Sequence, residues 1–168
     1  MHWLPLVIKA IGSERTIGEL IPWLEENICI DSPKFDDELL LALAEEIEKG
    51  WRKFGLWDER SAFLKIIQKL LWIDESHVRD QAAKCLCNIA KEMTSSELNT
   101  VLSPFVLDLS SDVWFTGRLS ACSLIPATYK QMPKNRSQLK NAFFKLCKDK
   151  MPLVRWAAAM NIGELTWS

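Results

Sequence analysis

The chain has 168 residues, of which 48% are hydrophobic and 26% charged, with 21 basic and 22 acidic side chains. This balance indicates a soluble globular protein with a buried core, and it excludes an intrinsically disordered chain. The sequence has no basic stripe with interleaved aromatic residues, and no apolar run approaches the roughly 18 residues of a membrane helix. We therefore expect neither nucleic acid nor a membrane as a partner.

The spacing of apolar residues predicts helices along the whole chain and no strands. The opening segment MHWLPLVIKAIG lacks the basic start of a signal peptide, so we expect it to form a buried helix at 3–11. Helix pairs are expected at 14–29 with 37–49, 58–72 with 77–93, 95–110 with 115–131, and 136–148 with 152–166. Pro22 and Pro104 fall inside the first helices of their pairs and should kink them.

Capping signals mark several of these helix ends. Thr94 and Glu97 have the spacing of a capping box, and Asn135 is expected to be the N-cap of the helix after Pro133. Gly50 has the position of a C-terminal stop.

Similar segments recur about every 40 residues, which is the signature of a helical solenoid. Each has an acidic turn, an arginine and, three residues later, an alanine. The arginines are Arg79, Arg118 and Arg155, and the alanines are Ala82, Ala121 and Ala158. A fourth segment, at 31–47, places Ala42 in the same register. We expect these alanines to mark close helix contacts, in a single array over 1–168 made of a half repeat at 1–12 and helix pairs at 13–50, 51–93, 94–131 and 132–168.

The segments that carry these turns resemble HEAT repeats. In chain order they are ERTIGELIPWLEENI, DDELLLALAEEI, VRDQAAKCL, DVWFTGRLSACSL and MPLVRWAAAMNIGEL. From about Lys9 onward they are similar to the N-terminal part of the scaffold (A, or 65-kilodalton regulatory) subunits of protein phosphatase 2A. The resemblance implies a non-catalytic scaffold without cofactors, whose turns form a ridge.

In that family, the N-terminal repeats hold a regulatory (B-type) subunit, and the last repeats hold the catalytic subunit. The resemblance therefore implies that this chain binds a regulatory subunit and would need later repeats to bind the catalytic one. The partner-binding residues that it implies are Phe35, Asp36, Asp37, Glu38, Glu75, His77, Asp112, Trp114, Phe115, Met151 and Pro152. The repeated arginines and alanines are expected to be structural.

The repeat pattern is irregular in three places. Glu38 or Leu39 stands where the other segments have arginine, as the family also shows in that repeat, and Trp156 follows Arg155 where relatives tend to carry a second arginine. The spacing from acid to arginine is also one residue shorter before Arg79 than before Arg118. The polar ladder between repeats is therefore expected to be irregular.

Two exposed tryptophans are predicted. Trp114 either faces a partner, which we favour because tryptophan is enriched at interface hot spots, or packs under its own turn. Phe115 belongs to the same turn and can also close the start of the next helix. Trp156 should face away from the core of its own pair, either lining the concave surface or capping the open end.

No constellation for catalysis or metal binding is recognised. His77 has no nucleophile or second histidine beside it, so a turn or cap role is the better interpretation. Cys85 and Cys87 point to different faces of one helix and cannot share a metal. The five cysteines lie in apolar segments, which indicates reduced thiols in a cytoplasmic protein, with the nucleus as a second location.

Alternative interpretations remain beside the scaffold. The chain could be a HEAT adaptor for an unrelated transport or cytoskeletal cargo, or a fragment of a longer scaffold. The acidic run at 36–38 is explained by the helix dipole alone, or it also meets a basic loop of a partner. Because the chain ends just after an amphipathic helix, we expect a partly apolar C-terminal face and self-association.

Overall fold

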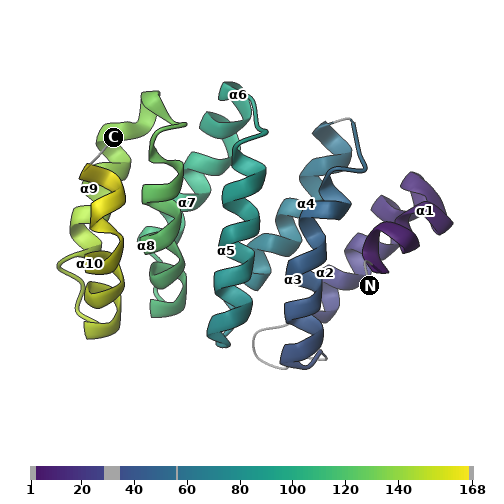
Figure 1. The fold of residues 1–168 in the computed structure, drawn as a ribbon, viewed down its shortest axis with the longest axis horizontal. Helices are drawn as coiled ribbons and strands as arrows, with labels where there is room; N and C mark the ends of the chain where they lie inside the picture. Colours follow the sequence, from purple (N-terminus) through teal and green to yellow (C-terminus); the bar gives the residue numbers. More distant parts are fainter. Residues whose placement is uncertain (1–2, 29–34, 56, 167–168) are drawn as a thin grey trace. The chain divides into compact units, whose positions relative to one another are not determined.

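A computed structural model describes residues 3–28, 35–55 and 57–166 (Figure 1). Helices make up all the regular structure of these residues, and none of the helices is long and apolar enough to cross a membrane. The chain divides into two compact units, unit 1 at Met1–Leu86 and unit 2 at Cys87–Ser168. The predicted fold class, all-α with helix pairs of the solenoid type, is confirmed.

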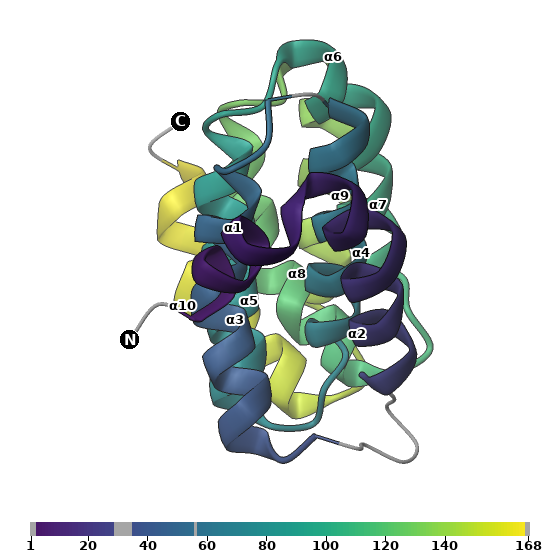
Figure 2. The same cartoon turned by 90° about the vertical axis from the view of Figure 1, so that its right-hand side faces the viewer.

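Unit 1 holds the first helix pairs. Its elements are α1 (Trp3–Arg15), the π-helical η1 (Thr16–Leu20), α2 (Ile21–Asn27), α3 (Asp37–Trp51), α4 (Trp57–Leu70) and the larger part of α5 (Ser76–Ala90). Helix α1 packs on α3, and both α2 and α3 pack on α4. Gly12 interrupts α1 with a φ of 83°, a left-handed conformation that favours glycine, and Figure 2 shows the change of direction.

Unit 2 continues the pattern of antiparallel pairs. Its elements after α5 are α6 (Ser95–Glu97), the π-helical η2 (Leu98–Leu102), α7 (Ser103–Ser110), α8 (Phe115–Tyr129), the 3-10 helix η3 (Pro133–Asn135), α9 (Arg136–Leu146) and α10 (Pro152–Thr166). Helix α8 packs against α7, α9 and α10, and thus forms the centre of this unit.

The expected proline kinks take the form of π-helical turns. Both π segments end two residues before a proline, η1 before Pro22 and η2 before Pro104. A proline has no N–H to donate, and its ring clashes with the carbonyl four residues earlier, so a wider turn relieves both problems. Pro126 also lies inside a helix, α8, but no π-helical segment precedes it there.

The predicted capping box is confirmed, the prediction for Asn135 is correct in position only, and the prediction for Gly50 is wrong. The Thr94 hydroxyl accepts the N–H of Glu97, and the Glu97 carboxylate accepts the N–H of Thr94 at 2.7 Å. Asn135 is the N-cap residue of α9, as predicted, but its side chain makes no capping hydrogen bond, and its amide instead donates to the hydroxyl of Ser103 at 2.5 Å. Gly50 does not end a helix, since α3 continues to Trp51.

Gly50 instead marks a close helix contact. A Cβ at this position would lie 2.8 Å from Cε1 of Phe63 and 3.1 Å from Cδ2 of Leu4. We expect Gly50→Val to lower the free energy of unfolding by about 1–3 kcal/mol through overpacking, measured by urea denaturation. Gly18→Val is the matched control, because a Cβ on helical Gly18 meets nothing within 4 Å. Equal losses in both variants would contradict this explanation.

The repeat register is correct in three helices and wrong by one residue in α3. Ala82, Ala121 and Ala158, each the seventh residue of its helix, are fully buried. In α3 the seventh residue is Leu43, which is buried, while Ala42 is only half-buried. Leu40, and not Glu38 or Leu39, therefore stands where the other helices carry arginine. The reason is that the Asp36 side chain caps α3 by accepting the N–H of Leu39, so α3 begins one residue later than the repeat register predicts.

Candidate protein-docking turns

Arg118 joins the turn before α8 to the turn before α10. Its Nη1 donates to the carbonyl oxygens of Asp112 and Val113, at 2.7 and 2.9 Å, in the turn before α8. Its Nε and Nη2 donate to the two carboxylate oxygens of Asp149, at 2.7 and 3.0 Å, in the turn before α10. This buried, bidentate ion pair fixes the two turns relative to each other.

Asp149 is held in its charged form. Burial alone would raise the pKa of its carboxyl, but the hydrogen bonds from Arg118 and from the backbone N–H of Met151 outweigh burial and lower the pKa below its usual value. The same carboxylate therefore binds Arg118 and shapes its own turn, with 2.9 Å between Oδ1 and the Met151 nitrogen.

The repeated arginines cap their turns in one common register. In each case Nη1 donates to the carbonyl oxygens of the residues six and five positions before the arginine. These are Ile73 and Asp74 for Arg79, at 2.7 and 2.6 Å, and Asp149 and Lys150 for Arg155, at 2.8 and 3.1 Å. Ile73 thus occupies the position that Asp112 and Asp149 occupy in unit 2, which accounts for the shorter spacing seen in the sequence.

The turn before α8 presents apolar side chains to solvent. Trp114 is 71% exposed, so its indole does not pack under its own turn, and neighbouring Val113 is also exposed. The backbone N–H of Trp114 donates to Oδ1 of Asp112 at 2.8 Å, so the turn is fixed without the indole. Phe115 begins α8 and is half-buried, which is compatible with both roles expected for it, contact with a partner and closure of the helix start.

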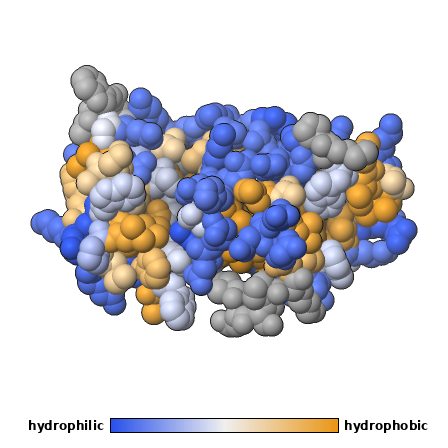
Figure 3. Space-filling view, turned by 60° about the horizontal axis from the view of Figure 1, so that its bottom comes forward, coloured by the Kyte–Doolittle hydropathy of each residue, from blue (hydrophilic) through white to orange (hydrophobic). Residues whose placement is uncertain are grey.

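The turn before α10 adds further apolar surface. Met151 is half-buried, while Pro152 and Leu153 are exposed. We call Val113, Trp114, Met151, Pro152 and Leu153 the turn surface of unit 2. Figure 3, in which the lower helix ends of Figure 1 come forward, shows apolar side chains gathered in patches among hydrophilic ones. An exposed apolar cluster on rigid turns can bind protein, because it gains by desolvation and loses little entropy.

The remaining candidate residues lie at turns of unit 1. Asp36, Asp37 and Glu38 are exposed at the start of α3, beside the half-buried Phe35. Before α5, one carboxylate oxygen of Glu75 accepts the backbone N–H of His77 at 3.1 Å and lies 2.9 Å from its Nδ1. The hydrogen bond from the His77 side chain lowers the pKa of Glu75.

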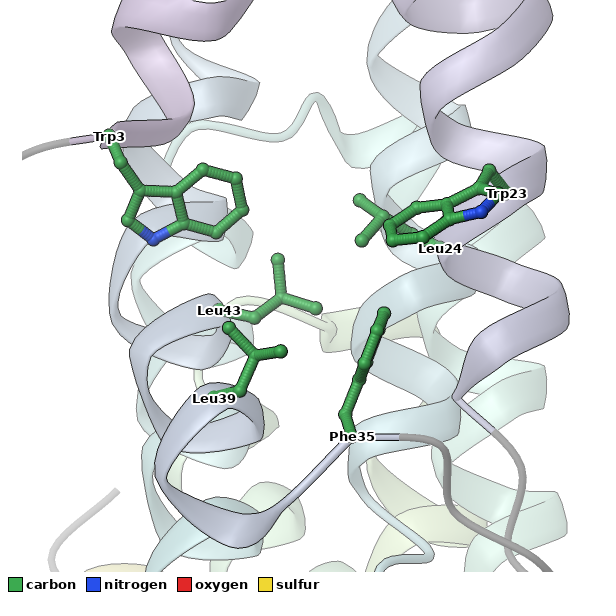
Figure 4. A pocket seen from close by; sticks show the side chains of 6 residues that line it. All are labelled: Trp3, Trp23, Leu24, Phe35, Leu39 and Leu43. Atoms are coloured by element: carbon green, nitrogen blue, oxygen red, sulfur yellow. The ribbon is translucent and has the colours of Figure 1, made fainter.

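Sequence reasoning missed an apolar pocket in unit 1, shown in Figure 4. Its lining residues are Trp3, Trp23, Leu24, Phe35, Leu39 and Leu43. They come from three helices and from Phe35, which precedes α3, so periodicity within one helix could not reveal them. The available signal was a tryptophan in each of the first two helices.

Metal-ligand groups and buried thiols were the remaining candidates for chemistry among the described residues. No group of three or more His, Cys, Asp or Glu side chains among them could hold a metal ion. Burial raises the pKa of Cys87 to about 11 and that of Cys122 to about 12, so both thiols are protonated at neutral pH. A protonated thiol is a poor nucleophile.

These features define an all-helical protein built of packed helix pairs, with apolar side chains exposed on its turns. The HEAT repeat family matches residues 139–166, which cover most of α9 and α10. Over 162 residues, or 96% of its length, the chain is 36% identical to regulatory and scaffold subunits of protein phosphatase 2A. They include the alpha isoform of the 65 kDa regulatory (A) subunit of Arabidopsis thaliana, the scaffold subunit of Dictyostelium discoideum and the beta isoform of the 65 kDa regulatory (A) subunit of Homo sapiens.

The resemblance to the phosphatase 2A scaffold subunits is thereby confirmed. The chain spans 27% of the Arabidopsis and Dictyostelium proteins and 26% of the human one. Those proteins are named regulatory or scaffold subunits, and neither name describes a catalytic chain.

Proposed function

We propose that this chain is a non-catalytic scaffold that binds a regulatory (B-type) subunit of protein phosphatase 2A through its turns. The observation that carries the proposal is Trp114, which is 71% exposed on a turn fixed by Arg118. Tryptophan is among the residue types most enriched at interface hot spots, and a fixed turn reduces the entropy lost when such a side chain binds. The similarity to phosphatase 2A scaffold subunits identifies the kind of partner.

The proposal assigns the other candidate residues to the same interface. Phe35 and the acidic run at 36–38, Glu75 with His77, and Met151 with Pro152 would each contact the partner. The exposed carboxylates at 36–38 favour a basic loop of the partner. The complex would form in the cytoplasm or nucleus, without nucleic acid or a membrane as a further partner.

Binding to purified subunits tests the proposal. We expect the chain to bind a regulatory subunit in calorimetric titration, and to compete with a full-length scaffold for it. At micromolar concentration we expect no binding of the catalytic subunit. The reason is that this chain has the turns proposed to contact the regulatory subunit, whereas the family binds the catalytic one through later repeats.

Two results would contradict the proposal. Direct binding of the purified catalytic subunit would show that later repeats are not needed. Failure to bind regulatory subunits of every class, by a chain whose circular dichroism is helical, would leave a HEAT adaptor for another cargo as the better explanation.

A further inference from the structure

The apolar pocket of unit 1 lies between α1, α2 and α3 and measures about 200 Å³ (Figure 4). All six lining side chains are apolar. The rings of Trp23 and Phe35 form one wall, with 5.5 Å between their centroids and an interplanar angle of 52°. The indole nitrogen of Trp23 points away from the other lining residues (Figure 4). The pocket therefore suits an apolar group.

The pocket has a buried floor and an exposed rim. Leu24 and Leu43 form the floor and are each 2% exposed, whereas Trp23 and Leu39 at the rim are 52% and 44% exposed. Sites for small molecules usually measure about 300–1,000 Å³. This smaller pocket fits a single large side chain of a protein.

The rim carries negative charge. The acidic run at 36–38 is exposed and stands between the lining residues Phe35 and Leu39. The basic neighbours in sequence, His2 and Lys34, lie outside the described residues. A negative rim favours an apolar side chain flanked by lysine or arginine, and it disfavours the phosphate groups of lipids and nucleic acids.

Helix α10 of the same chain presents such a side chain. Leu153, Trp156 and Met160 share one face of α10 and are 48%, 62% and 68% exposed. The residues at the same positions of α5 are His77, Asp80 and Lys84, which are exposed but polar. The apolar stripe of α10 is therefore absent from the same face of α5. The sequence prediction that Trp156 faces away from its own core is confirmed.

Positive charge surrounds this stripe. Lys148, Lys150 and Arg155 are exposed, and the acidic Asp149 among them is neutralised by Arg118. Arg155 uses only Nη1 for its own turn, so its Nε and Nη2 make no bond within the described residues. A guanidinium edge of this kind can bind a carboxylate with two hydrogen bonds.

We propose that the pocket of one copy receives Trp156 from α10 of a second copy, with Arg155 beside the acidic run at 36–38. The occupant and the pocket match in size, in apolar character and in charge. This interaction goes beyond the proposed scaffold function and does not involve Trp114.

The proposed contact joins two different surfaces and is therefore heterologous. A heterologous contact that does not close into a ring adds copies without limit, whereas pairing of two α10 stripes would stop at a dimer. We expect the average mass in sedimentation equilibrium to rise from 19.3 kDa, without levelling at twice that value, between about 10 µM and 1 mM.

Two variants separate these possibilities. Trp156→Ala removes the inserted side chain and leaves the pocket intact, while Leu39→Lys places a positive charge at the rim and leaves α10 intact. Each variant alone should remain monomeric, with association weakened at least about thirtyfold, which corresponds to the loss of a hot-spot tryptophan. An equimolar mixture of the two should form a one-to-one dimer, because one intact pocket and one intact Trp156 remain.

Trp114→Ala is the matched control, since it removes another exposed tryptophan and should leave association unchanged. Circular-dichroism melting establishes that each variant is folded. A monomeric parent chain throughout the concentration range would overturn the proposal. An average mass that levels at that of a dimer, and that Leu39→Lys does not lower, would also overturn it, because this result would indicate pairing of two α10 stripes. Loss of association in a mixture of the two variants would also overturn it. Because these measurements contain no regulatory subunit, their outcome can be distinguished from success or failure of the proposed scaffold function.

Discussion

Arg118→Ala should lower the free energy of unfolding by about 3–5 kcal/mol, the usual cost of removing one partner of a buried ion pair. Among the described residues, the variant leaves the Asp149 carboxylate with only the N–H of Met151 as a hydrogen-bond donor. It also removes the donor that the Asp112 and Val113 carbonyls share. Urea denaturation followed by circular dichroism measures the loss.

Arg155→Ala is the matched control for Arg118→Ala. Arg155 caps its turn through the same two types of carbonyl contact, but it is exposed and has no carboxylate partner within the described residues. Its replacement should cost no more than about 1 kcal/mol, as expected for exposed hydrogen bonds. Similar losses in the two variants would show that turn capping, and not the ion pair with Asp149, stabilises unit 2.

The pH dependence of the Arg118→Ala effect follows from the lowered pKa of Asp149. A carboxyl with a lowered folded-state pKa contributes its full stability above the unfolded-state value of about 3.9, and loses it as the pH falls through the folded-state pKa. The difference between parent and Arg118→Ala should therefore be constant near neutral pH and shrink below about pH 4.

Helix identity could be predicted because the apolar spacing and the caps agree. The Thr94 capping box begins its helix as expected, and buried Ala82, Ala121 and Ala158 lie in the predicted register. The failures occur where a side chain has a second use that the local sequence does not show. Gly50 resembles a stop signal but admits Phe63, and Asn135 lies at the N-cap but its side chain binds Ser103 on another helix.

The candidate site was predictable only in part, for a similar reason. Trp114 precedes α8 and does not belong to its apolar stripe. The sequence therefore favoured an exposed side chain, which the structure shows. The bidentate contact of Arg118 joins it to a residue 31 positions away, and the pocket of unit 1 draws on three elements. Such tertiary contacts depend on how helices pack, which the period of a single helix does not determine.

Trp114→Ala should weaken binding of the regulatory subunit by about 2 kcal/mol or more, which is about thirtyfold in affinity. The substitution removes a large aromatic surface that the folded chain leaves in solvent. It should leave the melting temperature almost unchanged, because the turn is held by Asp112 and Arg118 through backbone atoms that alanine retains. Calorimetric titration and circular-dichroism melting measure the two effects.

Two comparison variants separate docking from stability at this turn. Val113→Ala changes the exposed neighbouring residue and should alter both measurements little, since valine offers a smaller surface than tryptophan. Ala121→Leu forces extra carbons into a fully buried position, at a cost of about 1–3 kcal/mol, and should lower the melting temperature and weaken binding only as far as the helices unfold. If Trp114→Ala instead melts early and binds the regulatory subunit with the affinity of the parent, Trp114 acts in stability and the docking surface lies elsewhere.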